Sequence, residues 1–251
     1  MARQLRKGKQ ARFDVEPAAY TLAYRRVADE GRRQQPLRSL EVQGCDSYAT
    51  QDVDILVRRE GERLSFAVTP HAPVRLESFE VSLAHAFSTG EQVLLNGYQS
   101  WTTTSWLPAS HGMRGLSAVP PAIVNRYALD AMGDYRFTRY GGPGSQHGFT
   151  YGLMRAGRQC ALVASLDESR GFTLIRTDET AGTVTLRTEC PQRTLAPGET
   201  LTIGDYGLFI GAEETLYDRW FALSGIDARP VMPLVGYSSW YRHYGDVDHA
   251  K

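Results

Sequence analysis

The sequence predicts an all-β fold, a large antiparallel β-sandwich with one amphipathic helix close to the carboxyl terminus. Between about residues 19 and 210, apolar residues alternate with polar ones or form short runs, which is typical of strands. Gly and Pro punctuate these runs, and helical spacing is nearly absent there. No repeat of about 20 to 50 residues is visible, so we set propellers and solenoids aside. The 251 residues suffice for one large domain or two small ones.

The expected strands follow one another at the spacing of a two-sheet sandwich. In the first half they are residues 20–24, 53–57, 64–68 and, as one unusually long strand, 73–87. In the second half they are residues 135–137, 149–154, 159–166, 172–175, 183–186 and 201–210. Residues 58–62 and 155–158 supply turns between neighbouring strands. This arrangement favours two sheets that share one core.

The pattern changes after Gly211. Residues 212–223 place Leu216, Trp220 and Leu223 on one face at helical spacing, with acidic residues in the first turn and Gly225 as a stop. We therefore expect one amphipathic helix there, followed by a linker at 226–230. A short apolar strand then leads into a dense aromatic segment close to Lys251. The domains expected are a basic tail at 1–18, the β domain at 19–230 and a separate segment at 231–251.

Composition excludes several classes of function. The 28 basic and 28 acidic side chains balance, which argues against a nucleic-acid binder and against a disordered chain. No apolar stretch approaches the roughly 20 residues that a membrane span needs. The basic amino terminus is followed by no apolar core of a secretory signal, so we expect a cytoplasmic chain. An RNA-binding arm and an organelle transit peptide stay open as alternatives for that terminus.

The three cysteines, Cys45, Cys160 and Cys190, are expected to be free thiols. Their number is odd and no Cys-x-x-Cys spacing occurs, which argues against a zinc site and against a disulfide framework. Cys160 lies in an apolar run where a thiol packs as a small hydrophobe. We expect neither a metal nor a cofactor.

Residues 94–106 are the first segment that could carry a function. Tyr98, Trp101 and Trp106 lie among an amide pair and hydroxyl side chains. Aromatic faces beside hydrogen-bonding groups are what a sugar ring with one apolar face needs. The alternative, which stays open, is that these rings belong to the core or to an interface.

Residues 237–249 are the second such segment. A metal site would recruit His243, Asp246, Asp248 and His249, but their spacing matches no established metal motif. A sugar-site wall that uses Trp240 is the better interpretation. The glycine-rich residues 141–148 carry no phosphate-binding ending and are expected to form a hairpin or loop.

Several motifs resemble those of one family. The run from Asn96 to Trp101, Asn-Gly-Tyr-Gln-Ser-Trp, is similar to a signature in the amino-terminal β-supersandwich of α-galactosidases of glycoside hydrolase family 36. His147-Gly148-Phe149 and the helix containing Tyr217-Asp218-Arg219-Trp220-Phe221 look like later landmarks of that domain. Residues 236–241, Gly-Tyr-Ser-Ser-Trp-Tyr, resemble the opening strand of the family's (β/α)8 catalytic barrel.

The resemblance implies a non-catalytic amino-terminal domain of a retaining α-galactosidase, with 231–251 as the start of its barrel. The family's two catalytic aspartates belong to later barrel strands, and neither Asp246 nor Asp248 matches them, so no catalytic residue is expected here. The expected substrate-binding residues are Trp240, which matches a tryptophan that walls the galactose pocket, and Trp101, Tyr98 and Gln99. Tyr98 stands where Trp is frequent in the family.

The same resemblance implies which molecules the chain would meet. They are a galactoside, as substrate of the parent enzyme, and the chain's own catalytic barrel, with a homo-oligomer as an open alternative. Nucleic acid and membrane are not expected partners. The runner-up function is a stand-alone carbohydrate-binding or scaffolding β-sandwich, and a plain structural interaction module is the third.

Overall fold

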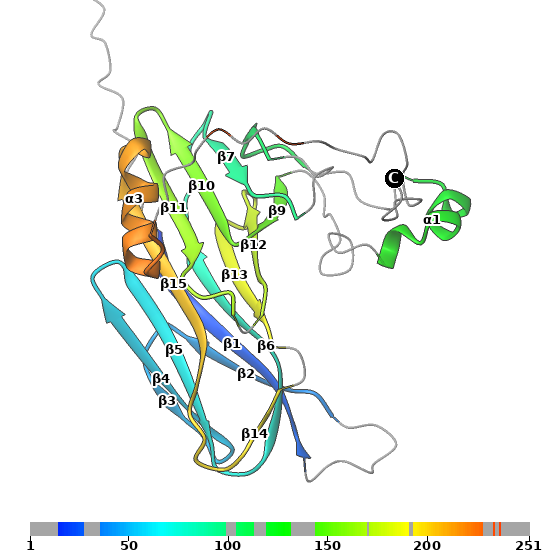
Figure 1. Ribbon diagram of the computed structural model, residues 1–251, viewed down its shortest axis with the longest axis vertical. Helices are drawn as coiled ribbons and strands as arrows, with labels where there is room; N and C mark the ends of the chain where they lie inside the picture. Colours follow the sequence, from blue (N-terminus) through cyan, green and yellow to red (C-terminus); the bar gives the residue numbers. More distant parts are fainter. Residues whose placement is uncertain are drawn as a thin grey trace, which may run out of the picture.

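The computed structural model describes residues 15–27, 36–98, 104–112, 119–131, 144–169, 171–190 and 193–227, together with Pro233 and Gly236. Within these residues the strands form two antiparallel sheets on either side of a shared hydrophobic core (Figure 1). The all-β sandwich expected from the sequence is therefore confirmed.

Both sheets combine strands from distant parts of the sequence. In the described residues, a seven-stranded sheet runs β2 (Arg38–Gln43), β1 (Glu16–Arg26), β6 (Val74–Ala84), β13 (Thr183–Glu189), β12 (Thr173–Asp178) and β9 (Ser145–Phe149), with β14 (Thr194–Leu195) paired to β6. An eight-stranded sheet runs β3 (Tyr48–Ala49), β4 (Val53–Glu60), β5 (Arg63–Pro70), β15 (Leu201–Gly211), β11 (Gln159–Ser165), β10 (Tyr151–Ala156), β7 (Gln92–Leu95) and β8 (Trp106–Pro108). Because the chain passes repeatedly between the sheets, most neighbouring strands are distant in sequence.

Strands with a clear pattern lie where the sequence places them. The expected segments at 20–24, 53–57, 64–68, 159–166, 172–175, 183–186 and 201–210 correspond to β1, β4, β5, β11, β12, β13 and β15, although Leu166 and Phe172 lie one residue outside their strands. The long strand expected over 73–87 is β6, which has 11 residues. Both expected turns are found, since two residues separate β4 from β5 and β10 from β11. The segment 135–137 lies outside the described residues.

Two expectations were wrong. Residues 149–154 were expected as one strand, but β9 ends at Phe149 and β10 begins at Tyr151 in the other sheet. The glycine-rich segment 141–148 was expected to form a hairpin or loop, but its residues from Ser145 onward belong to β9, which pairs with β12. In both cases the partner strand decides the conformation, because pairing and burial override local propensity in a sheet.

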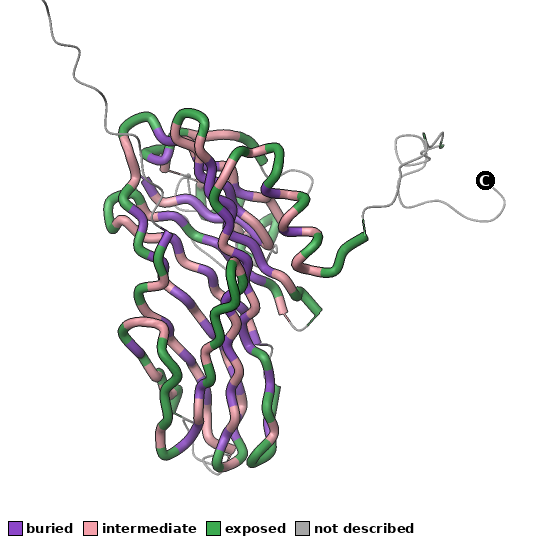
Figure 2. Tube along the Cα trace, turned by 90° about the vertical axis from the view of Figure 1, so that its left-hand side faces the viewer, coloured by how far each residue is buried: buried purple, intermediate pink, exposed green. Residues whose placement is uncertain are grey.

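The core between the sheets is centred on four buried aromatic rings. Tyr20 and Phe79 come from the seven-stranded sheet, and Phe66 and Tyr206 come from the eight-stranded one. The ring centroids of Phe66 and Phe79 lie 4.8 Å apart, and those of Tyr20 and Phe66 lie 5.4 Å apart. Buried and half-buried positions alternate along β13. Figure 2 shows how buried, intermediate and exposed positions are distributed along the trace. These rings join the two sheets across the core.

Helix α3 (Glu213–Ser224) covers part of the outer face of the eight-stranded sheet (Figure 1). Leu216 and Trp220 are its buried residues, and they pack with Leu162 and Phe209 of β11 and β15. Because both faces of β11 are thus covered, its residues from Cys160 to Ser165 are all buried, which explains the unbroken apolar run in the sequence. The helix ends at Gly225, as expected.

A second helix was not foreseen. Helix α1 (Pro121–Tyr127) has no buried residue and lies away from the sandwich (Figure 1), followed by a short 3-10 helix at Leu129–Ala131. None of the helices in the described part of the chain is both long and apolar enough to cross a membrane.

We predict that Trp220→Ala lowers the free energy of unfolding by roughly 3–5 kcal/mol, the range for a buried Trp. The ring is 7% exposed, and its Nε1 donates to the carbonyl oxygen of Ser165 at 2.9 Å. Urea unfolding followed by circular dichroism measures the change. Asp218→Ala, at an exposed position of the same helix, is the matched control and should cost less than about 1 kcal/mol. A small loss for Trp220→Ala would mean that α3 does not pack on the sheet.

Candidate functional site

The described part of the first aromatic motif lies at the end of β7, against the end of β9. The half-buried ring of Tyr98 contacts Phe149, with ring centroids 4.9 Å apart. It also meets Phe172 edge-on, with centroids 5.6 Å apart and planes at 79°. The structure therefore brings together two motifs, at 96–98 and 147–149, that the sequence separates by about 50 residues.

Backbone contacts hold these two motifs together. The amide of Phe149 donates to the carbonyl oxygen of Asn96 at 2.8 Å. The amide of Asn96 donates to the carbonyl oxygen of Tyr151 at 3.4 Å. The backbones approach so closely that a Cβ atom on Gly148 would lie 2.6 Å from the Leu95 Cβ and 2.7 Å from the Asn96 oxygen. Position 148 therefore requires glycine for lack of space.

Thr150 forms the corner between the sheets, next to this contact. Its φ of 67° lies in the left-handed region, where a β-branched residue is a genuine outlier. The Thr150 amide donates to the Thr173 oxygen at 2.9 Å, and the Thr150 oxygen accepts from the Ser165 amide at 2.7 Å. Both backbone groups of the corner are thus bonded to the two ends of the loop that connects β11 to β12.

That loop adds two residues that the sequence did not single out, Glu168 and Phe172. Phe172 is 47% exposed, although it contacts Tyr98. Glu168 Oε2 accepts a hydrogen bond from the amide of Thr173 at 3.1 Å. The sequence interpretation placed Phe172 inside a strand, but β12 begins one residue later, at Thr173, so the ring is released from the sheet. No sequence signal marks Glu168.

Partial desolvation raises the pKa of the Glu168 carboxyl group, although the residue as a whole is exposed. Hydrogen bonds from Thr173 and Ser165 act in the opposite direction, and the negative charge of Asp167 raises the pKa further. Behind the loop, Thr173 Oγ1 lies 3.5 Å from Thr188 Oγ1, which lies 2.8 Å from the Tyr206 hydroxyl. Burial raises the pKa of Tyr206, so this chain of hydroxyls remains neutral.

Of the predicted substrate-binding residues, Tyr98 is the one that the structure describes. Gln99, Trp101 and Trp240 lie outside the described residues, so their expected roles stay predictions. Trp106 lies in β8, where the Arg155 guanidinium covers its ring at 4.0 Å from the centroid. His147, in the second motif, is buried.

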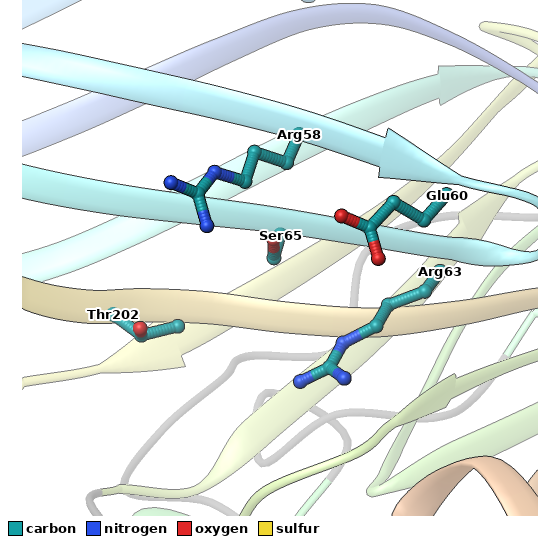
Figure 3. A pocket seen from close by; sticks show the side chains of 5 residues that line it. All are labelled: Arg58, Glu60, Arg63, Ser65 and Thr202. Atoms are coloured by element: carbon teal, nitrogen blue, oxygen red, sulfur yellow. The ribbon is translucent and has the colours of Figure 1, made fainter.

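A separate polar depression of about 210 Å³ lies over β4, β5 and β15, far from Tyr98 in the strand order of the sheet. Its lining residues, Arg58, Glu60, Arg63, Ser65 and Thr202, are shown in Figure 3. Arg63 forms two hydrogen bonds with Asp205, at 2.8 and 2.6 Å. The depression is thus lined by charges of both signs and by no aromatic side chain, so we assign it no ligand.

Metal and thiol chemistry find no support in the described part of the chain. No group of three or more His, Cys, Asp or Glu side chains there could hold a metal ion. The three cysteines are free, with Cys160 and Cys190 buried and Cys45 half-buried. Burial raises the pKa of the Cys45 thiol to about 11, so it is not a reactive thiolate.

Comparison with known proteins finds similarity to solved structures alone. No family model matches the chain, and no curated protein sequence matches it. A solved α-galactosidase from Lactobacillus brevis aligns over 97% of this chain with 12% sequence identity and a TM-score of 0.41. The aligned part is 35% of that protein's chain, so this chain spans about a third of its length. A likeness at this level carries no argument about activity.

We predict that Gly148→Ala lowers the free energy of unfolding by about 1–3 kcal/mol, because overpacking forces the backbone of Asn96 to move. The clash involves backbone atoms, which cannot rotate away as a flexible side chain can. Urea unfolding measures the change in stability. The amide chemical shifts of residues 95–98 report the local displacement, because the fluorescence of Tyr98 is masked by tryptophan. Gly236→Ala, where a Cβ atom meets nothing within 4 Å, is the control. Unchanged stability and shifts would contradict the close approach.

Glu168 should make stability depend on pH. Because its folded-state pKa is raised, the stability it contributes is fully present below the unfolded pKa and is lost as the pH rises through the folded pKa. Glu168→Gln removes this dependence while keeping an acceptor for the Thr173 amide. The variant's free energy of unfolding minus that of the wild type should therefore increase as the pH rises above the unfolded pKa of about 4.3. Urea unfolding at several pH values measures it, and a constant or falling difference would contradict the assignment.

Proposed function

We propose that this chain is the amino-terminal, non-catalytic domain of a retaining α-galactosidase of glycoside hydrolase family 36. The observation that carries the proposal is the contact between the motifs at 96–98 and 147–149. Each was matched to the family separately, and they pack against each other through Tyr98, Phe149 and Gly148. Motifs that matched by chance would have no reason to meet at one corner of the fold.

The domain's role in this proposal is to frame a sugar site rather than to perform the chemistry. A retaining glycosidase needs two carboxyl groups about 5 Å apart, one as nucleophile and one as acid and then base. In the proposal these belong to the chain's own barrel, which begins near residue 231 and is the domain's principal partner. The loop that contains Tyr98, Gln99 and Trp101 would present aromatic faces to the galactoside, and Trp240 would wall the pocket.

A cytoplasmic location belongs to the same proposal. Three free cysteines, two of them buried, are compatible with a reducing compartment.

The stand-alone binding module is the second candidate, and the exposed ring of Phe172 beside Tyr98 is the observation in its favour. The two candidates differ in affinity. A domain that only frames a site lacks most partners of the sugar and should bind galactose at millimolar concentration or more weakly, whereas a true module should bind at micromolar concentration.

We predict that the purified 251-residue chain releases no p-nitrophenol from p-nitrophenyl α-galactoside. Without a nucleophile and a proton donor, binding groups alone cannot break the glycosidic bond. An authentic α-galactosidase in the same assay is the positive control. Turnover that copurifies with the chain would overturn the non-catalytic assignment.

The DNA beyond codon 251 tests the parentage itself. A reading frame there that encodes a (β/α)8 barrel with two catalytic aspartates is the expected result. Coding sequence for an unrelated fold would overturn the proposal.

A further inference from the structure

An exposed aromatic surface with an adjacent carboxylate lies beside Tyr98. We call it the Phe172 platform and define it by Tyr98, Phe149, Phe172 and Glu168. Phe149 is buried and Tyr98 half-buried, while Phe172 presents nearly half of its surface to solvent. The rings of Tyr98 and Phe172 meet edge to face, with centroids 5.6 Å apart, so Tyr98 packs against Phe172.

Phe172 is exposed on a backbone that hydrogen bonds hold in place. Its carbonyl oxygen accepts from the Glu189 amide at 3.0 Å, and the next residue, Thr173, bonds both Glu168 and the corner at Thr150. A backbone held in this way loses little conformational entropy when its side chain meets a ligand, which is what preorganisation contributes to binding.

Glu168 supplies the polar part of the platform. A carboxylate offers about four acceptor positions. The Thr173 amide occupies one of them at 3.1 Å, so acceptor positions remain for a ligand hydroxyl. Glu168 and the neighbouring Asp167 are both acidic and exposed, so an anionic ligand would be repelled.

We propose that the Phe172 platform is a subsite for a neutral pyranose, with the ring of Phe172 against the apolar face of the sugar and Glu168 accepting from one of its hydroxyls. An aromatic face with one oriented acceptor distinguishes this ligand class from a lipid, which needs no acceptor, and from a phosphorylated sugar, which the two acids would repel. The inference rests on the proposed function only for the identity of the sugar as a galactoside.

The experiment is a titration of the full ¹⁵N-labelled chain with methyl α-D-galactopyranoside, followed by amide chemical shifts. The expected result is saturable change at Glu168, Phe172 and Thr173 with a Kd of about 1–50 mM, because one stacking contact and few hydrogen bonds give weak binding. Phe172→Ala should abolish the change and Phe172→Tyr, which keeps the ring, should restore it. Glu168→Gln should weaken binding by about 3- to 10-fold.

Tyr48→Ala is the matched control. Tyr48 is 48% exposed but belongs to β3, at the edge of the eight-stranded sheet opposite to β7 and β8. This variant should bind as the wild type does. The dispersion of the amide chemical shifts reports whether each variant folds. A loss of binding in a folded Phe172→Ala variant is therefore attributable to the ring of Phe172.

The outcomes separate the two proposals. No change at these amides up to about 100 mM sugar, or change that persists in Phe172→Ala, would overturn the subsite and leave the proposed function to its own hydrolysis and DNA tests. Equal response to methyl α-D-mannopyranoside would support a pyranose subsite and overturn its assignment to galactosides.

Discussion

The corner at Thr150 is the constraint on which the candidate site depends. There the chain leaves β9 in one sheet and enters β10 in the other with a single residue between them. A β-branched residue in the left-handed region costs free energy, of order 1–3 kcal/mol, and persists only where its surroundings fix it. The hydrogen bonds of Thr150 to Ser165 and Thr173 provide that fixation. Because the same bonds hold both ends of the β11–β12 loop, the corner also places Glu168 and Phe172.

The sheet pairing explains why the aromatic residues gather at this corner. The end of β7 lies beside β10 in the eight-stranded sheet, and the end of β9 lies beside β12 in the seven-stranded sheet. Tyr98 follows the first of these ends and Phe149 closes the second, so the two rings meet where the sheets come together. Gly148 permits the approach, since any side chain there would displace Asn96. Rigid strands thus position a short aromatic loop, as expected of a site carried by a scaffold.

Much of the fold could be predicted from the sequence because its strongest signals are periodic. Strands such as β5 and β13 bury alternate residues, and α3 repeats Leu216 and Trp220 at helical spacing. β7 and β8 were missed because strands of four and three residues are too short for a period to be recognised. The break at Thr150 was missed because its cause is not local: Thr173 and Ser165 hold the corner from elsewhere in the sequence.

Within the candidate site, the sequence allowed only the residues of the two motifs to be predicted. Tyr98 was found because it belongs to a dense aromatic segment, and the structure places it beside the second motif. Phe172 and Glu168 carry no such signal, because an isolated Phe at the start of a strand and a Glu in a polar loop are ordinary in any sandwich. Their importance follows from a neighbour about 70 residues away, which only the fold supplies.

The most direct test of this account is amide hydrogen exchange at Phe149, Thr150 and Ser165 in the native chain. If the corner fixes the aromatic loop to the sandwich, these three amides exchange only in the global unfolding reaction, with the same free energy as the central amides of β11, such as Leu162 and Val163. Exchange at the rate of exposed loops, with β11 still protected, would show that the corner opens independently and does not hold the site together.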